Sequence, residues 1–380
     1  MMSTPAHGVA KINEKYGLPT GRVETFSDSF HGLAIRGGST VAANCSSCHG
    51  FHNILPSSDP RSTINKVNLP ATCGKCHPGA SENFARGAVH LAFTAQQEPM
   101  LYYAREFYVL LIFFTIGGMA LHNALDFLRK LRREYRRRGG GSATLRTGEY
   151  NALTGGTQRW IQRMTLSERW QHALMGSSFF VLVYTGFALK FPDSWPFAWI
   201  VALEKGYAWR SWIHRGAAVF MILACLWHLA YLPTKRGRAH LLAMLPRYQD
   251  VKEAVLNFGY LLGLRAEPPG FDRFSYIEKA EYWALIWGSA VMAGTGFMLW
   301  FENLTLRFLA KWVLDLATLV HYYEAWLATL AILVWHIYYV IFNPDVYPMN
   351  WTWLTGRVSE EMLRHEHPRE YERLREEGEL

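Results

Sequence analysis

Five stretches of about 20 apolar residues constrain the fold of this chain more than any other feature of its sequence. Each is long enough to cross the hydrocarbon core of a lipid bilayer as a single α-helix. In lipid the backbone N–H and C=O groups must bond to one another, so such a segment spans as a helix and not as irregular chain. The sequence therefore predicts an all-α membrane protein with five transmembrane helices. The predicted spans are residues 107–128, 170–190, 209–232, 280–301 and 318–342.

Basic residues between the spans predict their orientation. The chain has a net charge of +8, and basic residues cluster after the first span, at 129–138, and after the third, at 235–238. The loops after the second and fourth spans are nearly free of Lys and Arg. Because basic loops stay in the cytoplasm, we expect the N-terminal part outside and the C-terminus inside a bacterial or archaeal inner (cytoplasmic) membrane. The charge is thus a signal of topology, and no nucleic-acid partner is expected.

Two copies of the motif Cys-x-x-Cys-His, at 45–49 and 73–77, precede the first span. This motif attaches c-type haem: both thiols bond covalently to the haem, and the His binds its iron. Two Cys-x-x-Cys pairs could instead bind structural zinc, but a His directly after each pair favours haem. Attachment outside the cytoplasm agrees with the predicted orientation. The two expected c-type haems would use Cys45, Cys48, His49, Cys73, Cys76 and His77.

A haem iron in an electron carrier usually takes a second axial ligand, His or Met, from the protein. Three histidines near the motifs are candidates for the two positions: His31, His52 and His90. One of them is therefore spare or serves another haem. The segment around them is rich in Gly, Pro, Ser and Asn. We expect the haems, rather than apolar side chains, to form the centre of this small, loop-rich external domain.

Two further segments carry predictions of their own. The stretch 239–262 has an apolar face and flanking basic residues, which predicts a helix on the inner membrane surface. The first 30 residues contain no apolar stretch of the kind found in signal peptides, so we expect a truncated start, with further haem motifs upstream.

Changes of composition along the chain predict five regions. They are an external dihaem c domain (1–100), a first transmembrane anchor and basic stop (101–138), a cytoplasmic linker (139–168), a four-helix cytochrome b domain (169–345) and a cytoplasmic tail (346–380).

Histidines inside the spans predict a second pair of cofactors. A histidine buried in a membrane is costly and is by default a functional residue. His214 and His228 share one span, and His321 and His336 share another. At about 100° per residue each pair returns to nearly one helix face, about 21–22 Å further along. Two such helices facing each other could hold two stacked b-type haems, each iron bound by two histidines.

Residues 165–372 resemble the cytochrome b anchor subunits of respiratory formate dehydrogenases, hydrogenases and thiosulfate reductases. The N-terminal part, including 68–78, resembles the terminal repeats of multihaem cytochromes c. The first resemblance implies two b haems that pass electrons between a menaquinone pocket and an external redox subunit. It rests on Glu-Arg-Trp-Gln-His at 168–172, Tyr-Thr-Gly-Phe at 184–187, His-Arg-Gly at 214–216, His321, His336 and the tail segments 356–359 and 365–368.

The resemblance also implies the ligand pairs. His214 and His321 would bind the outer haem. For the inner haem the anchor-subunit pattern pairs His172 with His336, whereas spacing alone pairs His228 with His336, as in quinol-oxidising bc complexes. The Arg-x-x-His at 169–172 favours His172. His228 would then hydrogen-bond a haem propionate or a quinone, or pair with His122 for a third haem. For His122 itself, core packing is the better interpretation.

These features together predict a membrane electron-transfer cytochrome of anaerobic respiration. Two b haems would link the menaquinone pool to the external c haems and to an external redox subunit or multihaem cytochrome. The chain would be the quinol-oxidising or quinone-reducing electron-transfer subunit of an oxidoreductase complex. Candidates for the quinone site near the inner face are His122, Asn123, Asp126 and the start of the second span around Arg169. For Asp126, a counter-ion to the neighbouring arginine run is the better interpretation. No separate catalytic residue is expected, since the sequence has no nucleophile–base pair or phosphate-binding loop.

Two alternatives remain open from the sequence. In the first, a c haem without a distal ligand makes the chain a multihaem reductase of a small nitrogen or sulfur oxyanion. In the second, zinc occupies the cysteine pairs and the span histidines are structural, which gives a membrane module without redox chemistry.

Overall fold

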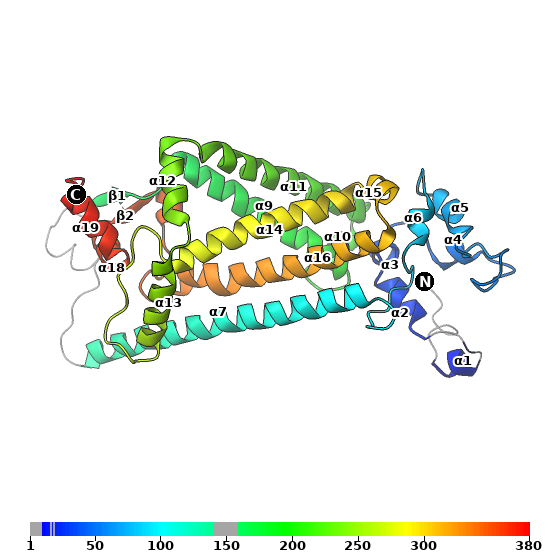
Figure 1. The fold of residues 1–380 in the computed structure, drawn as a ribbon, viewed down its shortest axis with the longest axis horizontal. Helices are drawn as coiled ribbons and strands as arrows, with labels where there is room; N and C mark the ends of the chain where they lie inside the picture. The colour runs from blue at the N-terminus through cyan, green and yellow to red at the C-terminus, as the bar shows by residue number, and fades with distance from the viewer. Residues whose placement is uncertain (1–9, 16, 18–19, 140–158) are drawn as a thin grey trace. The chain divides into compact units, whose positions relative to one another are not determined.

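The computed structural model describes residues 10–15, 17, 20–139 and 159–380, and it is largely helical (Figure 1). The chain forms two compact units, each built from three segments. Each unit contains part of every long helix, so the two are described separately. The first unit comprises Met1–Leu110, Ser178–Phe220 and Val291–Ala325, and the second comprises Leu111–Ser177, Met221–Ala290 and Trp326–Leu380.

Five helices are long and apolar enough to cross a membrane, which confirms the five predicted spans. Each begins several residues before its predicted start, because helical hydrogen bonding continues through the polar residues that flank the apolar core. The last span changes to π-helix at its C-terminal end. The helices are α7 (Pro99–Gly139), α9 (Leu166–Lys190), α11 (Gly206–Tyr231), α14 (Tyr276–Trp300) and α16 (Lys311–Ala331), followed by the π-helices η1 (Ile332–His336) and η2 (Tyr338–Phe342).

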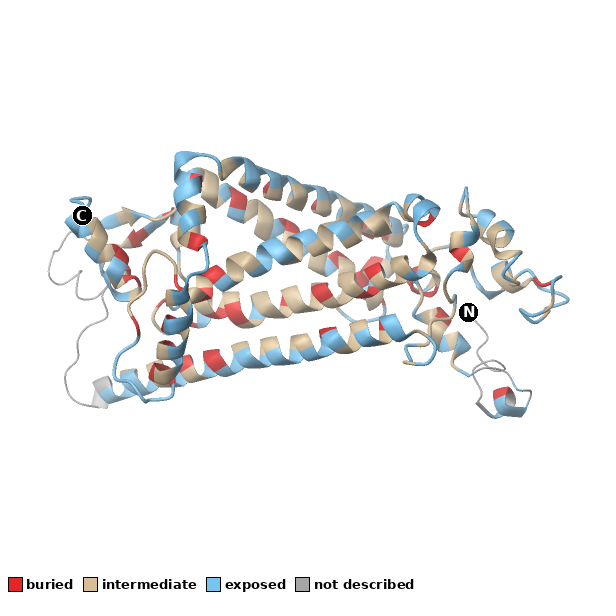
Figure 2. Ribbon diagram, viewed as in Figure 1, coloured by how far each residue is buried: buried red, intermediate tan, exposed pale blue. Residues whose placement is uncertain are grey.

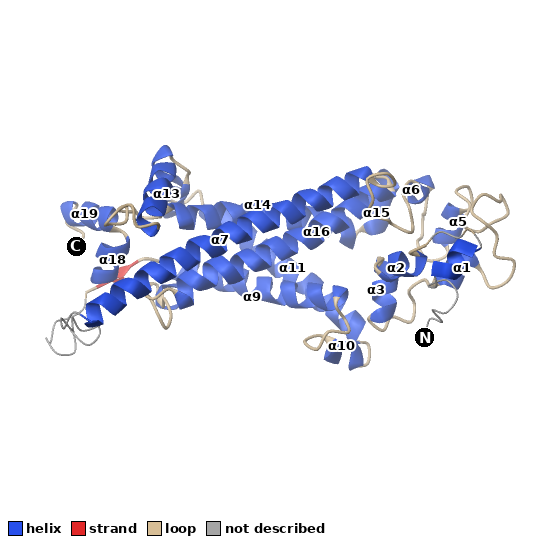
Figure 3. Ribbon diagram, turned by 90° about the horizontal axis from the view of Figure 1, so that it is seen from below, coloured by secondary structure: helices blue, strands red, loops and turns tan. Residues whose placement is uncertain are grey.

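The N-terminal part of the first unit consists of short helices and loops, as the composition predicts (Figure 3). Helix α4 carries the first Cys-x-x-Cys-His motif, and Asn44 and Ser47 close its N-terminus as a reciprocal capping box. Helix α5 ends within the second motif. The helices of this N-terminal module are α1 (Ala10–Lys15), α2 (Arg22–Ser27), α3 (Phe30–Arg36), α4 (Cys45–His49), α5 (Leu69–Gly74) and α6 (Glu82–Ala85).

Within the first unit, this N-terminal module contacts the segments that connect the long helices. Helix α6 packs against α15 (Glu302–Phe308), which joins α14 to α16. The other connecting helix, α10 (Ala198–Ala202), joins α9 to α11. Polar contacts hold the module in place, among them Asn83 Nδ2 to Arg307 O at 3.3 Å, Lys311 Nζ to Ala88 O at 2.9 Å, and Lys190 Nζ to Asp28 Oδ1 at 3.0 Å.

The second unit adds surface helices to the long ones. The prediction of one helix over 239–262 is wrong, since two helices, α12 (Lys235–Met244) and α13 (Tyr248–Leu261), occupy this stretch. Pro246 separates them, and the residue before it, Leu245, has extended backbone, as a residue before proline favours. The C-terminal part forms α17 (Thr352–Thr355), α18 (Glu360–Glu366) and α19 (Pro368–Glu376), and the strands β1 (Trp160–Gln162) and β2 (Arg357–Ser359) pair antiparallel.

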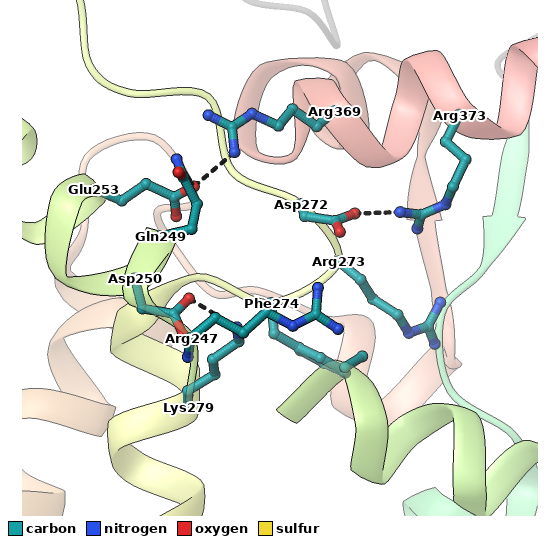
Figure 4. Close-up of a pocket in the computed structure, with 11 residues that line it drawn as sticks. Arg247, Gln249, Asp250, Glu253, Asp272, Arg273, Phe274, Lys279, Arg369 and Arg373 are labelled. Atoms are coloured by element: carbon teal, nitrogen blue, oxygen red, sulfur yellow. Dashed lines mark hydrogen bonds and ion pairs between the residues drawn. The ribbon is translucent and has the colours of Figure 1, made fainter. Parts of the chain in front are cut away.

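Ion pairs hold the C-terminal helix α19 in the second unit. They line a small surface pocket in which carboxylates of α13 and of the 272–273 segment face basic side chains (Figure 4). Two of the pairs of α19 are Arg369–Glu253 at 2.7 Å and Arg373–Asp272 at 2.5 Å. Beside them, Lys279–Asp250 at 2.7 Å joins α14 to α13. The five-region division of the chain remains a prediction, and most of the predicted linker 139–168 lies outside the described residues.

Burial in the long helices is inverted relative to a water-soluble bundle (Figure 2). Large apolar side chains such as Phe113, Trp212 and Phe220 are exposed, whereas polar ones such as His122 and Glu324 are buried. Apolar surface of this extent suits contact with lipid, and a polar interior suits cofactors. The chain is therefore an integral membrane protein in its composition, its helix lengths and its burial.

Candidate functional site

The N-terminal module brings its histidines together in two pairs. The ring centres of His49 and His90 lie 6.5 Å apart, and those of His31 and His77 lie 6.2 Å apart. An iron bound by two imidazoles at about 2 Å from each nitrogen places the ring centres about 6 Å apart. Each motif histidine thus meets one of the three candidate distal ligands at a suitable distance. His52 is exposed and belongs to neither pair.

Hydrogen bonds in the module orient these imidazoles. The Thr25 hydroxyl donates to Gly21 O at 2.8 Å, so its oxygen accepts from His90 Nδ1 at 3.2 Å. His77 Nδ1 lies 3.2 Å from Asn303 Oδ1 in α15 and therefore donates to it. In both imidazoles Nε2 keeps its lone pair for a metal. Burial lowers the pKa of His90, which keeps the ring neutral, as a ligand must be.

The four motif cysteines are free thiols, exposed or half-buried. Burial raises the pKa of the Cys48 and Cys73 thiols, and neighbouring thiol groups raise it further. Within the described part of the chain, no three His, Cys, Asp or Glu side chains converge as a metal-ion site requires.

The first unit also contains His214 of α11 and His321 of α16, each held by a threonine. His214 Nδ1 lies 2.8 Å from Thr185 Oγ1, and His321 Nδ1 lies 2.9 Å from Thr295 Oγ1. Each threonine hydroxyl donates to the carbonyl four residues earlier in its own helix, at 2.6 and 2.7 Å. The threonine oxygen is therefore the acceptor, and Nε2 of both imidazoles is free to bind a metal. We call His214 and His321 the threonine-held pair.

A glycine follows each of these threonines. A Cβ atom placed on Gly186 would lie 3.5 Å from His214 Cε1, and one on Gly296 would lie 3.5 Å from His321 Cε1. The imidazole edge thus packs against bare backbone, and a larger side chain would push it away. The same pattern, Thr-Gly-Phe-x-Leu-x-Phe, occupies 185–191 and 295–301. Aligning these two segments would have revealed Thr295 and Gly296, which sequence reasoning missed.

In the second unit, His172 of α9 and His336 of η1 form another pair. Their ring centres lie 6.2 Å apart with the planes inclined by 38°. His336 Nδ1 lies 3.3 Å from Glu281 Oε2 in α14, so a carboxylate here takes the place of the threonine hydroxyl. The side chain of Asn123 in α7 donates to Val334 O within the π-helix. We call His172 and His336 the glutamate-held pair, and sequence reasoning did not identify Glu281.

His228 is not paired with another candidate ligand, although its ring centre lies 6.2 Å from that of His240 in α12. The Nδ1 of His228 lies 3.0 Å from Gln171 Oε1, and its Nε2 lies 2.9 Å from the Tyr282 hydroxyl. Both ring nitrogens are therefore engaged by protein. The structure brings His336 to His172, and it does not bring it to His228.

His122 lies in a buried polar network on α7. Its Nε2 is 2.9 Å from the Tyr276 hydroxyl and its Nδ1 is 3.3 Å from the Tyr339 hydroxyl. One turn later, Asp126 accepts from Tyr338 and pairs with Lys130, at 2.7 and 2.8 Å. His122 and His228 thus belong to separate hydrogen-bond networks, which gives no support to a third haem between them.

Comparison with known proteins adds one finding. The family model for prokaryotic cytochrome b561 matches residues 163–349. This cytochrome b561 match covers α9, α11, α14 and α16, with both histidine pairs of the long helices, and leaves out α7 and the N-terminal module. It implies a membrane cytochrome with b-type haem that takes part in electron transfer. No curated protein matches the chain.

Orphaned polar atoms beside both pairs fit the haem that the cytochrome b561 match implies. Arg169, one turn before His172, and Arg210, one turn before His214, each have a buried Nε with no partner among the described residues. Arg210 also donates from Nη1 to Thr185 O at 2.9 Å. Haem carries two propionates, whose oxygens accept from guanidinium groups. Both sites thus offer imidazole ligands together with an arginine donor.

Proposed function

We propose that this chain is a membrane electron-transfer cytochrome with two c haems and two b haems, each iron bound by two histidines. The observation that carries this proposal is that protein oxygens hydrogen-bond to Nδ1 of the candidate ligands. Within the described residues, each pair contains a histidine whose Nδ1 meets a protein oxygen at 2.8–3.3 Å, which directs Nε2 to a metal. Three proposed axial pairs have ring centres 6.2–6.5 Å apart: His49 with His90, His77 with His31, and His172 with His336. The fourth, His214 with His321, follows the pairing that the resemblance implies.

Two axial histidines favour electron transfer over catalysis at the iron. Haem supplies a one-electron couple when bound, and full coordination leaves no position for a substrate. His31 and His90 each stand at the distance of a second ligand, so both c haems would be complete. This geometry supports the electron carrier over the alternative of a reductase with an open c haem.

The route between the two kinds of haem would pass beside α15. His77 contacts Asn303 in α15, and α15 connects α14, which carries Thr295, to α16, which carries His321. The acceptor for one c-haem ligand and the threonine-held pair thus lie on consecutive elements of the first unit. Electrons would leave the external c haems to an external redox subunit or a multihaem cytochrome.

The quinone site would lie at the α7 network. Asn123 Oδ1 and Trp335 Nε1 are buried and have no partner in the part of the chain that the structure describes. An unpaired acceptor and an unpaired donor suit the hydroxyl and carbonyl groups of menaquinol and menaquinone. Lys130 pairs with Asp126 at 2.8 Å and with Asp345 at 3.0 Å. These three side chains would exchange the protons of the quinol with the cytoplasm, in a protein of the inner membrane.

A pyridine haemochrome spectrum of the detergent-purified protein, produced with cytochrome c maturation machinery, tests this proposal. We expect two c haems and two b haems per chain, and Cys76→Ala should lose one c haem while keeping both b haems. Zinc in place of haem would overturn the proposal. High-spin ferric iron at one haem of the unmodified protein would instead support the reductase.

A further inference from the structure

The two pairs in the long helices differ in the group that holds Nδ1. In the threonine-held pair both acceptors are neutral hydroxyls, Thr185 and Thr295. In the glutamate-held pair the acceptor on His336 is the carboxylate of Glu281. The second carboxylate oxygen, Glu281 Oε1, is buried, and no group in the described residues hydrogen-bonds to it.

A carboxylate changes an iron ligand in two ways. It strengthens the imidazole as a donor, because the Nδ1 proton is partly drawn toward the oxygen. It also places a negative charge near the iron, where water does not screen it. Both effects stabilise the ferric over the ferrous state, so they lower the reduction potential. A threonine hydroxyl fixes the ring but brings no charge.

The other charges near the two sites offset one another. Arg169 precedes His172 and Arg210 precedes His214 by one turn each, and both have an unpartnered buried Nε among the described residues. Each site therefore has one arginine one turn before a ligand. The threonine-held pair has two further charged residues of opposite sign, Arg215 next to His214 and Glu324 one turn after His321. Glu281 remains as the difference between them.

We infer that Glu281 is a positioning residue that holds the potential of the haem on His172 and His336 below that of the haem on His214 and His321. This inference rests on the proposed function and adds a direction to it. Quinol oxidation releases two electrons and two protons, and each electron would pass from the lower to the higher potential. Flow from quinol toward the external c haems is then downhill, and reverse flow is uphill.

The pattern shared by 185–191 in α9 and 295–301 in α14 suggests a substitution that removes the charge of Glu281. Aligning 185–191 with 295–301 also aligns Gln171 with Glu281, and Gln171 holds His228 as Glu281 holds His336. Glu281→Gln therefore installs a residue that the equivalent position of the first repeat already has. It keeps an oxygen acceptor for Nδ1 and removes the charge.

Redox titration of the b haems, followed in the visible spectrum, tests the inference. In Glu281→Gln we expect the ratio of ferrous to ferric haem at a fixed potential to rise at least tenfold for the lower-potential b haem, which is about 59 mV for one electron. The other b haem should not shift. Glu324→Gln is the matched control: it removes a buried carboxylate that accepts a hydrogen bond from Tyr108, and among the described residues no hydrogen bond joins it to a candidate ligand. It should leave the lower-potential haem unchanged.

The outcomes separate this inference from the proposed function. Two b haems with unchanged potentials in Glu281→Gln would overturn the role of Glu281 and leave the cytochrome intact. If Glu281→Gln loses haem, His172→Ala provides the test. The inference predicts that the b haem missing from His172→Ala is the one with the lower potential in the unmodified protein. Removal of the higher-potential haem would overturn the inference. A purified unmodified protein without b haem would overturn the proposed function instead.

Discussion

The two helix pairs α9–α11 and α14–α16 repeat one plan and then diverge. Both begin with a capping box, Thr165 with Glu168 and Ser275 with Glu278, and both hold a histidine with Thr-Gly. Between these shared features, α9 has Gln171-His172 where α14 has Glu281-Tyr282.

This divergence explains why the histidines have unequal roles. In the glutamate-held pair, His172 meets His336 at a distance suited to an iron. In the equivalent place Tyr282 meets His228 through a hydrogen bond of 2.9 Å. A tyrosine hydroxyl satisfies the imidazole directly, so one change of residue type would turn a proposed ligand pair into a structural contact. We therefore propose that the residue facing a histidine, more than its spacing, decides whether it binds haem.

The largest effect should come from breaking the two equivalent positions. His172→Ala removes an axial ligand, so we expect loss of one of the two b haems. Tyr282→Phe removes one hydrogen bond, worth about 0.5–1.5 kcal/mol, and should keep both b haems. Haem content per chain, measured by pyridine haemochrome, compares the two variants. Loss of a b haem in Tyr282→Phe would show that His228 and Tyr282 belong to a haem site.

A second comparison uses the glycines of α14. Gly296 faces the His321 ring at 3.5 Å, whereas a Cβ on Gly294 would meet nothing within 4 Å. Leucine at 296 should displace the imidazole, so we expect most of the threonine-held b haem to be lost in Gly296→Leu. Gly294→Leu introduces the same side chain on the same helix and should retain both haems. Equal b-haem content in the two variants would contradict the packing described for Gly296.

A smaller effect should follow from removing a threonine acceptor. Thr295→Val leaves His321 Nδ1 without its partner, and loss of such a contact weakens metal binding by about 10–100-fold. Thr318 in α16 makes the same bond to the carbonyl four residues earlier, at 2.9 Å, and among the described residues no hydrogen bond joins it to a candidate ligand. Thr318→Val is therefore the control. Haem transfer from the protein to an acceptor globin measures the relative affinities, and equal transfer rates would reject the role of Thr295.

The smallest effect concerns His240 in α12, outside both pairs. Burial lowers the pKa of His240 from 6.5 to about 4, helped by the charges of Arg273 and Arg236 and opposed by Glu168. The unfolded chain thus binds this proton at higher pH than the folded one. Its contribution to stability is complete above the unfolded pKa and is lost as the pH falls from about 6.5 toward about 4.

Melting temperatures of the purified protein at pH 7.5 and pH 5 test this dependence. His240→Phe, which keeps an aromatic ring and removes the titration, should lose less stability on acidification than the unmodified protein. His365→Asn, at an exposed position, is the control. An identical acid-induced drop in all three proteins would contradict the prediction.

The spans could be predicted from the sequence because apolar length is a local property. The break at Pro246 is also local, since proline interrupts a helix, and the prediction over 239–262 did not weigh it. The candidate ligands were recognisable by residue type and motif. Their pairing in the N-terminal module was not, because loops without periodicity do not show that His90 meets His49 and His31 meets His77.

The groups that hold the ligands were the hardest to predict. Glu281 lies 55 residues from His336 in the sequence, and a glutamate in the first turns of a span reads as an ordinary interfacial charge. Thr295 was accessible in principle, since it repeats the Thr-Gly-Phe pattern of 185–187. Such contacts depend on how helices face one another, which composition and spacing of one helix do not encode.

The contact between His77 and Asn303 has a consequence for biosynthesis. Asn303 is made 226 residues after His77, so the ribosome releases the second haem motif long before its acceptor exists. In the proposed cytochrome, covalent attachment at Cys73 and Cys76 could precede that contact, but the ligand would become oriented only when α15 has followed α14. Export, haem attachment and insertion of the fourth span would then be ordered in time, and the finished environment of the proposed c haem would mark a chain whose membrane insertion is nearly complete.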